Sequence, residues 1–286
     1  MKSVLFSILI LLAFSLNAQE HYKGLAVLKD TTRTRPAFDK PRPIEMKKSL
    51  FMNELTWMEI RDQMAAGYKT AIVMTGGLEM NGPYMVTDKH QIIGRTMAAK
   101  IAEKLGNTLV ATVVAYVPEG NLESKGGLIG YPGTIGVSQT TFESLITDIS
   151  TSLLHQGFQE IILLGDSGGN QDGLKKVAQQ MNKSNHDAKI RYVPQYYGYD
   201  KVMVFQETLG IEEVSEGIHD IFRDTAILLL DDPEHIREAA RRKKGLYHIN
   251  GVDLNDTEKI RNIANKIIDF QVNTTVYAIQ ELRPKD

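Results

Sequence analysis

The sequence predicts an α/β fold of three layers, in which helices cover both faces of a mostly parallel sheet. Between residues 70 and 193, short apolar runs alternate with longer segments of helical periodicity. The apolar runs carry few polar residues, which is typical of parallel strands buried on both faces. This β-α-β-α order favours a parallel sheet over separate helical and sheet regions.

Each element follows from a local pattern. Residues 54–66 carry apolar positions at helical spacing and end at Gly67. Four strands are predicted at residues 70–74, 108–115, 160–164 and 189–193, and three helices at residues 91–105, 139–155 and 171–182. After Pro194 the pattern is less regular: residues 225–230 fit a strand or a helix, and residues 233–244 and 257–282 fit helices. The last helix has a good start in the polar run 255–258.

The N-terminus predicts export. Residues 1–18 have a basic Lys2, an apolar stretch and a cleavage point at Ala18-Gln19, as in a signal peptide. Residues 19–48 are polar and proline-containing, which predicts an extended arm, and residues 49–286 form one α/β domain. We therefore expect a periplasmic or secreted protein without a stable membrane anchor, because the apolar stretch is shorter than a membrane span.

Composition excludes several kinds of chemistry. The chain has no cysteine, so disulfides, thiolate metal ligands and a cysteine nucleophile are excluded. Its formal net charge is -2, and no basic patch carries interleaved aromatic residues. Nucleic acid is therefore not an expected partner.

The most informative segment is the loop after the first strand. It carries Glu79, Asp88 and His90, whose oxygen and nitrogen donors suit a divalent metal. Open α/β sheets place their chemistry at the carboxyl ends of strands, which is where this loop begins. Two simpler interpretations stay open: Asp88 as the N-cap of the following helix, and His90 as a packing residue in its first turn.

Five motifs in a shared order resemble the creatininase (creatinine amidohydrolase) family. In the family loop Glu-Gln-His-Gly-Pro-His followed by Thr-Asp, this chain keeps the residues Glu79, Gly82, Pro83, Thr87 and Asp88. Asn81 and Tyr84 replace the two histidines, and the spacing to the aspartate is two residues shorter. The other motifs are residues 55–60, 130–135, 165–170 and 219–225. At residues 165–170 the family motif Asn-Gly-His-Gly-Gly-Asn is replaced by Gly-Asp-Ser-Gly-Gly-Asn.

The resemblance implies a three-layer α/β fold, usually oligomeric, that hydrolyses a cyclic amide or related carbon-nitrogen bond at a metal centre. Bound metal lowers the pKa of a water molecule and polarises the carbonyl group. Carried over by position, the carboxylate metal ligands are Glu79, Asp88 and Asp224, and His219 is a catalytic candidate together with Glu79. His90 is not a family position, but it is a candidate that could restore a nitrogen ligand, and Ser167 is a catalytic candidate only as a nucleophile. The substrate, which the resemblance implies is a small molecule, has four candidate binding residues: Asn81, Gly168, Gly169 and Asn170. The loss of two imidazoles shifts the expected ion from zinc toward manganese or magnesium.

Two other functions stay open. The Gly165-Asp166-Ser167 block, together with Asp232 and His235, has the spacing of some serine esterases, which would activate the Ser167 hydroxyl without metal. The replaced imidazole ligands also fit a catalytically inactive periplasmic ligand-binding protein on the same fold. A structural turn is the simpler interpretation of the two glycines after Ser167.

Overall fold

A computed structural model describes residues 38–184, 189–214 and 217–284. The chain divides into two units, Met1–Glu45 and Met46–Asp286. In the first unit, the described residues 38–45 form turns and no helix or strand. The signal peptide predicted for residues 1–18, and residues 19–37 of the predicted arm, lie outside the described residues.

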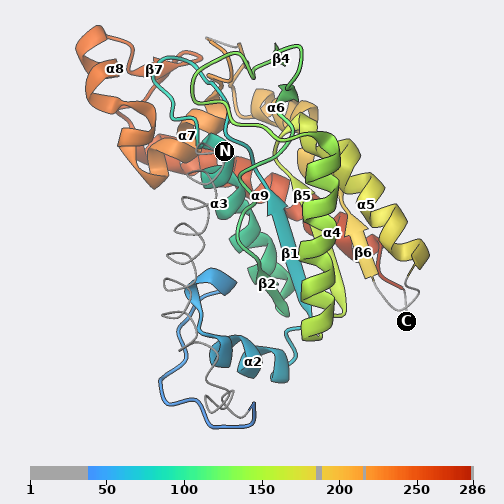
Figure 1. Cartoon of the computed structure of the whole chain (residues 1–286). Helices are drawn as coiled ribbons and strands as arrows, with labels where there is room; N and C mark the ends of the chain where they lie inside the picture. Colours follow the sequence, from blue (N-terminus) through green and yellow to red (C-terminus); the bar gives the residue numbers. More distant parts are fainter. Residues whose placement is uncertain (1–37, 185–188, 215–216, 285–286) are drawn as a thin grey trace, which may run out of the picture. The chain divides into compact units, whose positions relative to one another are not determined.

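The second unit is built on a four-stranded parallel sheet (Figure 1). Its strand order is β2 (Thr108–Val110), β1 (Thr70–Thr75), β5 (Glu160–Gly165) and β6 (Lys189–Tyr192). The central strands β1 and β5 pair along their whole length, from Thr70 opposite Glu160 to Thr75 opposite Gly165. This register brings the carboxyl ends of the two strands side by side, and the loops that follow them meet there.

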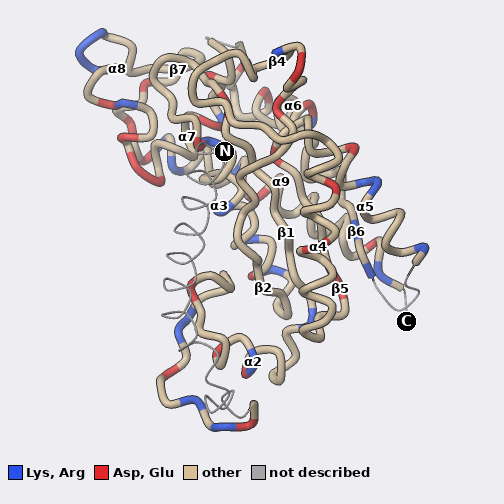
Figure 2. The backbone as a smooth tube through the Cα atoms, in the orientation of Figure 1, with Lys and Arg blue, Asp and Glu red and all other residues tan. Residues whose placement is uncertain are grey.

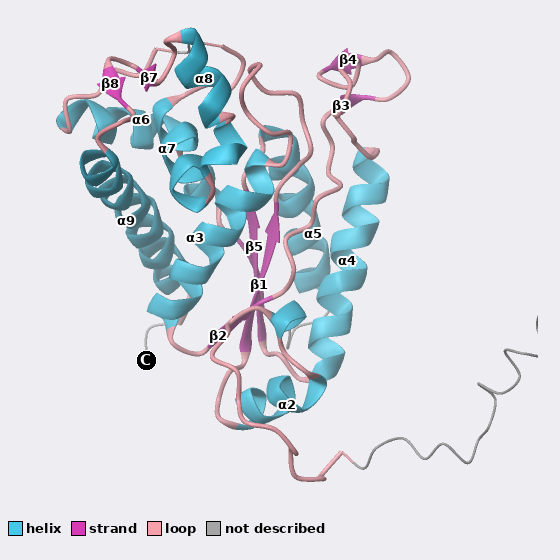
Figure 3. Cartoon of the chain, turned by 90° about the vertical axis from the view of Figure 1, so that its left-hand side faces the viewer, coloured by secondary structure: helices cyan, strands magenta, loops and turns pink. Residues whose placement is uncertain are grey.

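Helices cover both faces of the sheet, which confirms the predicted three-layer α/β fold (Figure 3). Alternate residues of a strand point to opposite faces. On one face, Ile72 and Met74 pack in a core with residues of α3 (Lys89–Leu105), α7 (Phe222–Asp231) and α9 (Thr257–Glu281). On the other, Ala71 and Val73 pack with residues of α4 (Gln139–Gln156) and α5 (Gln171–Ser184).

Several helices begin at side-chain caps, including the helix start that the sequence predicts at residues 255–258. In α2 (Trp57–Ala65), the Thr56 side chain accepts from the Glu59 amide and the Glu59 carboxylate accepts from the Thr56 amide, which forms a capping box. The Asp256 side chain accepts from the Lys259 amide at the start of α9. Each cap satisfies amide groups that a helix start leaves without an intrahelical partner.

The structure differs from the sequence expectation in two places and decides between two alternatives in a third. Strand β2 ends at Val110, and the chain pairs with β1 again only at Val114. The ambiguous run 225–230 is helical, within α7. The helix expected at 233–244 is divided into η5 (Pro233–Ile236) and α8 (Glu238–Lys244), because Arg237 between them has a left-handed backbone with φ of 51°.

The remaining elements are short. They are η2 (Met52–Glu54), β3 (Gly120–Asn121), β4 (Gly126–Gly127), η3 (Gly168–Asn170), η4 (Pro194–Tyr197), α6 (Tyr199–Thr208), β7 (His248–Ile249) and β8 (Val252–Asp253). Figure 2 shows basic and acidic residues interspersed along the described chain. Among the described residues, no helix combines the length and the apolar character needed to cross a membrane.

Candidate active site

The loops after β1 and β5 are fastened to each other at the carboxyl edge of the sheet. The buried Asn170 side chain donates from Nδ2 to Thr75 Oγ1 at 2.8 Å and to the Gly76 carbonyl at 2.9 Å. Asn170, predicted as a substrate-binding residue, therefore uses its amide nitrogen to hold the two loops. The same edge carries Glu79 from the first loop and Asp166 from the second, both buried.

His90 joins these two carboxylates. Its Nε2 lies 2.7 Å from Glu79 Oε1, and its Nδ1 lies 2.7 Å from Asp166 Oδ2. Burial and the charge of Lys89 disfavour the protonated ring, but the hydrogen bonds to Asp166 and Glu79 outweigh them and raise the pKa of His90 to about 9. Burial likewise opposes ionisation of Glu79, yet the His90 hydrogen bond and the Lys89 charge lower its pKa to about 2. His90 is therefore a doubly bonded imidazolium at neutral pH.

Two further cations neutralise the acids. Lys89 Nζ lies 3.1 Å from Glu79 Oε1 and 3.6 Å from Asp224 Oδ2. Arg223 Nη1 donates to Asp224 Oδ1 at 2.6 Å, and Arg223 Nη2 lies 3.5 Å from Asp166 Oδ1. These three carboxylates therefore face three cationic side chains, which is how buried charges are normally accommodated.

His219 is the part of this cluster that faces solvent. Its side chain is 38% exposed, whereas that of Glu79 is 6% exposed. His219 Nδ1 lies 3.1 Å from Glu79 Oε1 and 3.1 Å from Asn81 Oδ1. The His219 backbone has φ of 60°, a left-handed conformation that costs energy in a residue with a side chain and is concentrated at functional sites.

Glu119 lines the same cluster. Its carboxyl is buried, and its Oε1 has no hydrogen-bond partner within the described structure. Burial, together with the charge of Glu79, raises the pKa of Glu119 to about 8. A side chain at Gly77 would collide with Glu119 Oε1, so glycine at this position lets the segment between β2 and β3 approach the loop after β1.

The structure brings together Glu79, His90, His219, Asn81 and Asp224, and it places Asp88 apart from them. Asp88 is exposed and occupies the N-cap position of α3, where its side chain makes no capping hydrogen bond. Its distance from Glu79 in the sequence is two residues shorter than in the family pattern. The residue at the family spacing is His90, which does contact Glu79.

The serine-esterase arrangement is not assembled in the described structure. Ser167 is buried, and no histidine hydrogen bond to its hydroxyl is found among the described residues. His235 Nδ1 instead lies 3.2 Å from Asp231 Oδ2. The backbone of Gly168 and Gly169 is exposed, and a Cβ atom on Gly169 would collide with the carbonyl oxygen of Pro118.

Sequence reasoning missed four residues of the cluster: Lys89, Asp166, Glu119 and Arg223. Asp166 carried a usable signal, because it directly follows a buried strand, at the same edge as the predicted loop. Lys89 lies beside His90 in the sequence, and Arg223 lies beside Asp224. Lysine and arginine are normally exposed, however, and are buried almost only where a charged partner is present. Their partners come from distant segments, so the sequence alone gave no reason to place them inside.

The donors in this arrangement do not fit a divalent metal. An imidazole binds metal through an unprotonated nitrogen, and both ring nitrogens of His90 face carboxylate oxygens. The Lys89 ammonium lies between Glu79 and Asp224, the two carboxylates that would share the ion. Within the described residues, no group of three histidine or acidic side chains is arranged to hold a metal.

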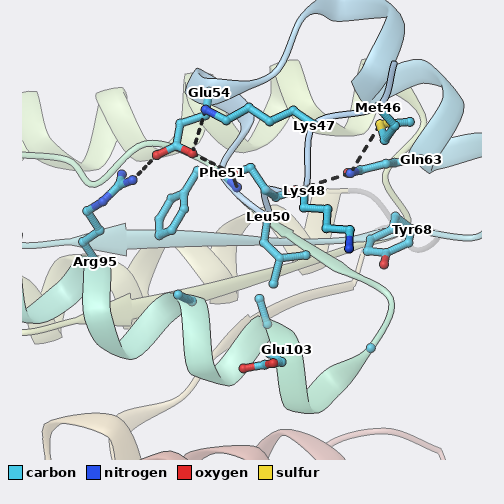
Figure 4. A pocket seen from close by; sticks show the side chains of 14 residues that line it. Met46, Lys47, Lys48, Leu50, Phe51, Glu54, Gln63, Tyr68, Arg95 and Glu103 are labelled. Carbon is cyan, nitrogen blue, oxygen red and sulfur yellow. Dashed lines mark hydrogen bonds and ion pairs between the residues drawn. The ribbon is translucent and has the colours of Figure 1, made fainter.

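A surface pocket lies elsewhere in this unit (Figure 4). Its volume is about 690 Å³, and its lining includes Leu50, Phe51, Tyr68, Arg95 and Glu103. Tyr68 precedes β1, so the pocket lies toward the amino ends of the strands, away from the acidic cluster. Open α/β sheets bind substrates at the carboxyl ends. The His219 cluster is therefore the candidate active site.

Comparison with curated proteins finds creatinine amidohydrolase of Pseudomonas putida. The two sequences are 29% identical over 119 residues, which cover 42% of this chain and 45% of the relative. The match thus spans less than half the length of that protein.

Solved structures extend the likeness over most of the chain. A crystal structure of creatinine amidohydrolase is 20% identical, covers 84% of this chain and 100% of its own, and has a TM-score of 0.60. A mutant creatininase of Zn-Zn type has the same TM-score, identity and coverage. A manganese creatininase has a TM-score of 0.59 at 19% identity, covering 83% of this chain and 100% of its own. The family model for creatininase, creatinine amidohydrolase, matches residues 53–264, and with well over half of its length matched this chain belongs to the creatininase family.

Proposed function

We propose that the chain is a creatininase-type hydrolase that cleaves a carbon-nitrogen bond, of the cyclic amide kind, in a small molecule. One observation carries the proposal: the half-exposed His219 is hydrogen-bonded through Nδ1 to the carboxyl edge of the sheet. A histidine held in this way has the geometry of a general base whose other ring nitrogen is directed to a reacting group. Family membership and the fold support the reaction class.

The neighbours of His219 fix its neutral tautomer. Asn81 Nδ2 donates to the carbonyl oxygens of Glu79 at 3.1 Å and Val86 at 2.7 Å. This orientation turns Asn81 Oδ1, an acceptor, toward His219 Nδ1. Glu79 Oε1 is also an acceptor, so Nδ1 carries the proton and Nε2 keeps its lone pair. Asn81, which replaces a family histidine, therefore acts here as a positioning residue.

The reaction then needs only water as a co-reactant. His219 Nε2 takes a proton from a water molecule, whose oxygen attacks the carbonyl carbon of the amide. The carbon-nitrogen bond breaks, and His219 returns the proton to the departing nitrogen, so that amide and water give a carboxylic acid and an amine. Gly168 and Gly169 are the first two residues of η3, where amide groups have no intrahelical partner. We assign these amides to the developing oxyanion.

The zinc and manganese forms of creatininase support a divalent ion in the family, and zinc, manganese or magnesium remains the prediction from the resemblance. Lys89 and His90 do not suit such an ion, and the hydrolysis steps above use only water and side chains and amides of this chain. The same two side chains favour a second function, which is ligand binding without turnover. Ser167, which stands where the family has an imidazole, favours it as well.

A substrate screen tests the proposal. We expect purified protein to open creatinine or a related five-membered cyclic amide, and His219→Gln to lower kcat/KM about 100- to 10,000-fold. The matched control is His155→Gln, an exposed histidine of α4, which should leave the rate unchanged. Turnover that survives in His219→Gln contradicts the general-base role, and binding without turnover across the screen supports the second function.

We also propose export and self-association. The signal-like residues 1–18 support a periplasmic or secreted location, and intact-mass analysis of the secreted or periplasmic fraction should find a chain that begins at Gln19. The family resemblance implies a homo-oligomer, which light scattering after gel filtration measures directly. A chain retained with Met1 in the cytoplasmic fraction, or a monomer at all concentrations, contradicts the respective proposal.

A further inference from the structure

A lysine occupies the position between the carboxylates that the resemblance assigns to the metal. Lys89 Nζ lies 3.1 Å from Glu79 Oε1 and 3.6 Å from Asp224 Oδ2. The Lys89 side chain is only 2% exposed, so water does not screen these contacts as it would on the surface. An ammonium bound by two buried carboxylates supplies the positive charge that a metal ion would supply there.

The neighbouring groups complete the same arrangement. His90 contacts a carboxylate through each ring nitrogen and therefore offers no free nitrogen to an ion. Asp224 is bound from the other side by Arg223, whose Nη1 donates to Asp224 Oδ1 at 2.6 Å. Glu79, Asp166 and Asp224 thus each have a cationic partner already. A divalent ion would have to displace the ammonium and enter among the remaining cations.

We propose that Lys89 is an internal replacement for the divalent metal of the creatininase family. Its ammonium holds Glu79 and Asp224 together, and the centre of this chain takes neither Zn²⁺ nor Mn²⁺ at that position. The replacement rests on the contacts of Lys89 and not on the proposed hydrolysis, so it holds equally for an enzyme and for a binding protein.

Metal uptake by the wild-type chain is the primary test. The purified protein is incubated with excess Zn²⁺ or Mn²⁺, passed through gel filtration, and analysed for metal content and thermal unfolding. An ion bound only by the folded state would raise the unfolding temperature. We expect the wild type to show no metal uptake and no rise in Tm beyond what Glu79→Gln shows. One equivalent of metal that disappears in Glu79→Gln overturns the proposal.

A gain of metal binding tests the position. Lys89→Met removes the ammonium and keeps the volume, leaving Glu79 and Asp224 to face each other. We expect this variant to take up one equivalent of Mn²⁺, detected by electron paramagnetic resonance. Lys104→Met, on the exposed side of α3, is the matched control and should take up none. A folded Lys89→Met chain that binds no Mn²⁺ overturns the assignment of the lysine to the metal position.

If Lys89→Met does not fold by itself, its refolding in the presence and absence of Mn²⁺ gives a second readout. Lys89→Arg keeps the charge and should fold without metal. Refolding of Lys89→Met that succeeds only with Mn²⁺ supports the proposal. Failure to refold with Mn²⁺, while Lys89→Arg folds, counts against it.

Discussion

Replacing Asp166 with asparagine tests how much the charge of this carboxylate stabilises the site. Asp166 is completely buried and lies at the end of β5. Its Oδ2 is 2.7 Å from His90 Nδ1, and its Oδ1 accepts from Tyr196 at 2.8 Å and lies 3.5 Å from Arg223 Nη2. Asparagine has nearly the same shape, so the substitution removes charge with little change in packing volume.

The expected cost follows from the groups left behind. Removing one partner of a buried ion pair typically costs about 3 to 5 kcal/mol, because the other charge stays buried without compensation. In Asp166→Asn, His90 keeps Glu79 and Arg223 keeps Asp224, and the asparagine oxygen still accepts one hydrogen bond. We therefore expect the lower end, about 3 kcal/mol, which lowers Tm by roughly 6 to 12 °C in a domain of this size.

Urea unfolding followed by circular dichroism measures this loss. The midpoint should fall while the slope of free energy against urea stays constant, since the surface exposed on unfolding is unchanged. Asp148→Asn, an exposed residue of α4, is the matched control and should stay within about 0.5 kcal/mol of wild type. A loss below about 1 kcal/mol in Asp166→Asn would refute the view that the cluster depends on this charge.

Two further predictions concern stability away from the candidate site. Glu160→Gln should cost about 1 to 2 kcal/mol at pH 7, because Arg191 and Arg283 both contact this carboxylate at the partly exposed edge of the sheet. Although burial opposes ionisation, the hydrogen bonds from Arg283 and Arg191 lower the folded-state pKa of Glu160 from 4.5. The contribution of Glu160 to the free energy of unfolding is therefore present above pH 4.5 and is lost as pH falls through the folded-state pKa. A difference in stability between wild type and variant that stays constant from about pH 6 to pH 3 would contradict this. Thr56→Ala should cost about 1 kcal/mol in urea unfolding, since it removes the capping box of α2, and an equal loss in Ser152→Ala, an exposed residue of α4, would argue against a specific cap.

The fold was predictable because burial shapes the sequence directly. Strands β1 and β5 are buried at every position, so they read as short apolar runs that sequence patterns identify within one residue. Helix α7 was ambiguous for the same physical reason. Residues 222–229 are buried all round, so no polar face reveals the helical period. Strand β2 was predicted too long because residues 111–115 remain partly apolar after regular pairing with β1 ends.

The candidate site was predictable only in outline. Strand ends pointed to the loop of Glu79, and the motif order pointed to His219, which the structure places 3.1 Å from Glu79. The partner of His90 was not predictable, because Asp166 is 76 residues away in the sequence. Lys89 was also missed, since a lysine is normally assigned to the surface unless a buried carboxylate is known to face it.

The contacts of Glu79 connect the proposed metal replacement with the proposed chemistry. A single oxygen, Glu79 Oε1, lies 2.7 Å from His90 Nε2, 3.1 Å from Lys89 Nζ and 3.1 Å from His219 Nδ1. Donors that surround a carboxylate stabilise its charged form. When His219 takes a proton at Nε2, Glu79 therefore stabilises the imidazolium without accepting its Nδ1 proton. The proton remains available at Nε2 for the leaving nitrogen. The ammonium of Lys89 thus has two effects: it keeps Glu79 ionised, and it occupies the position that a metal ion would take.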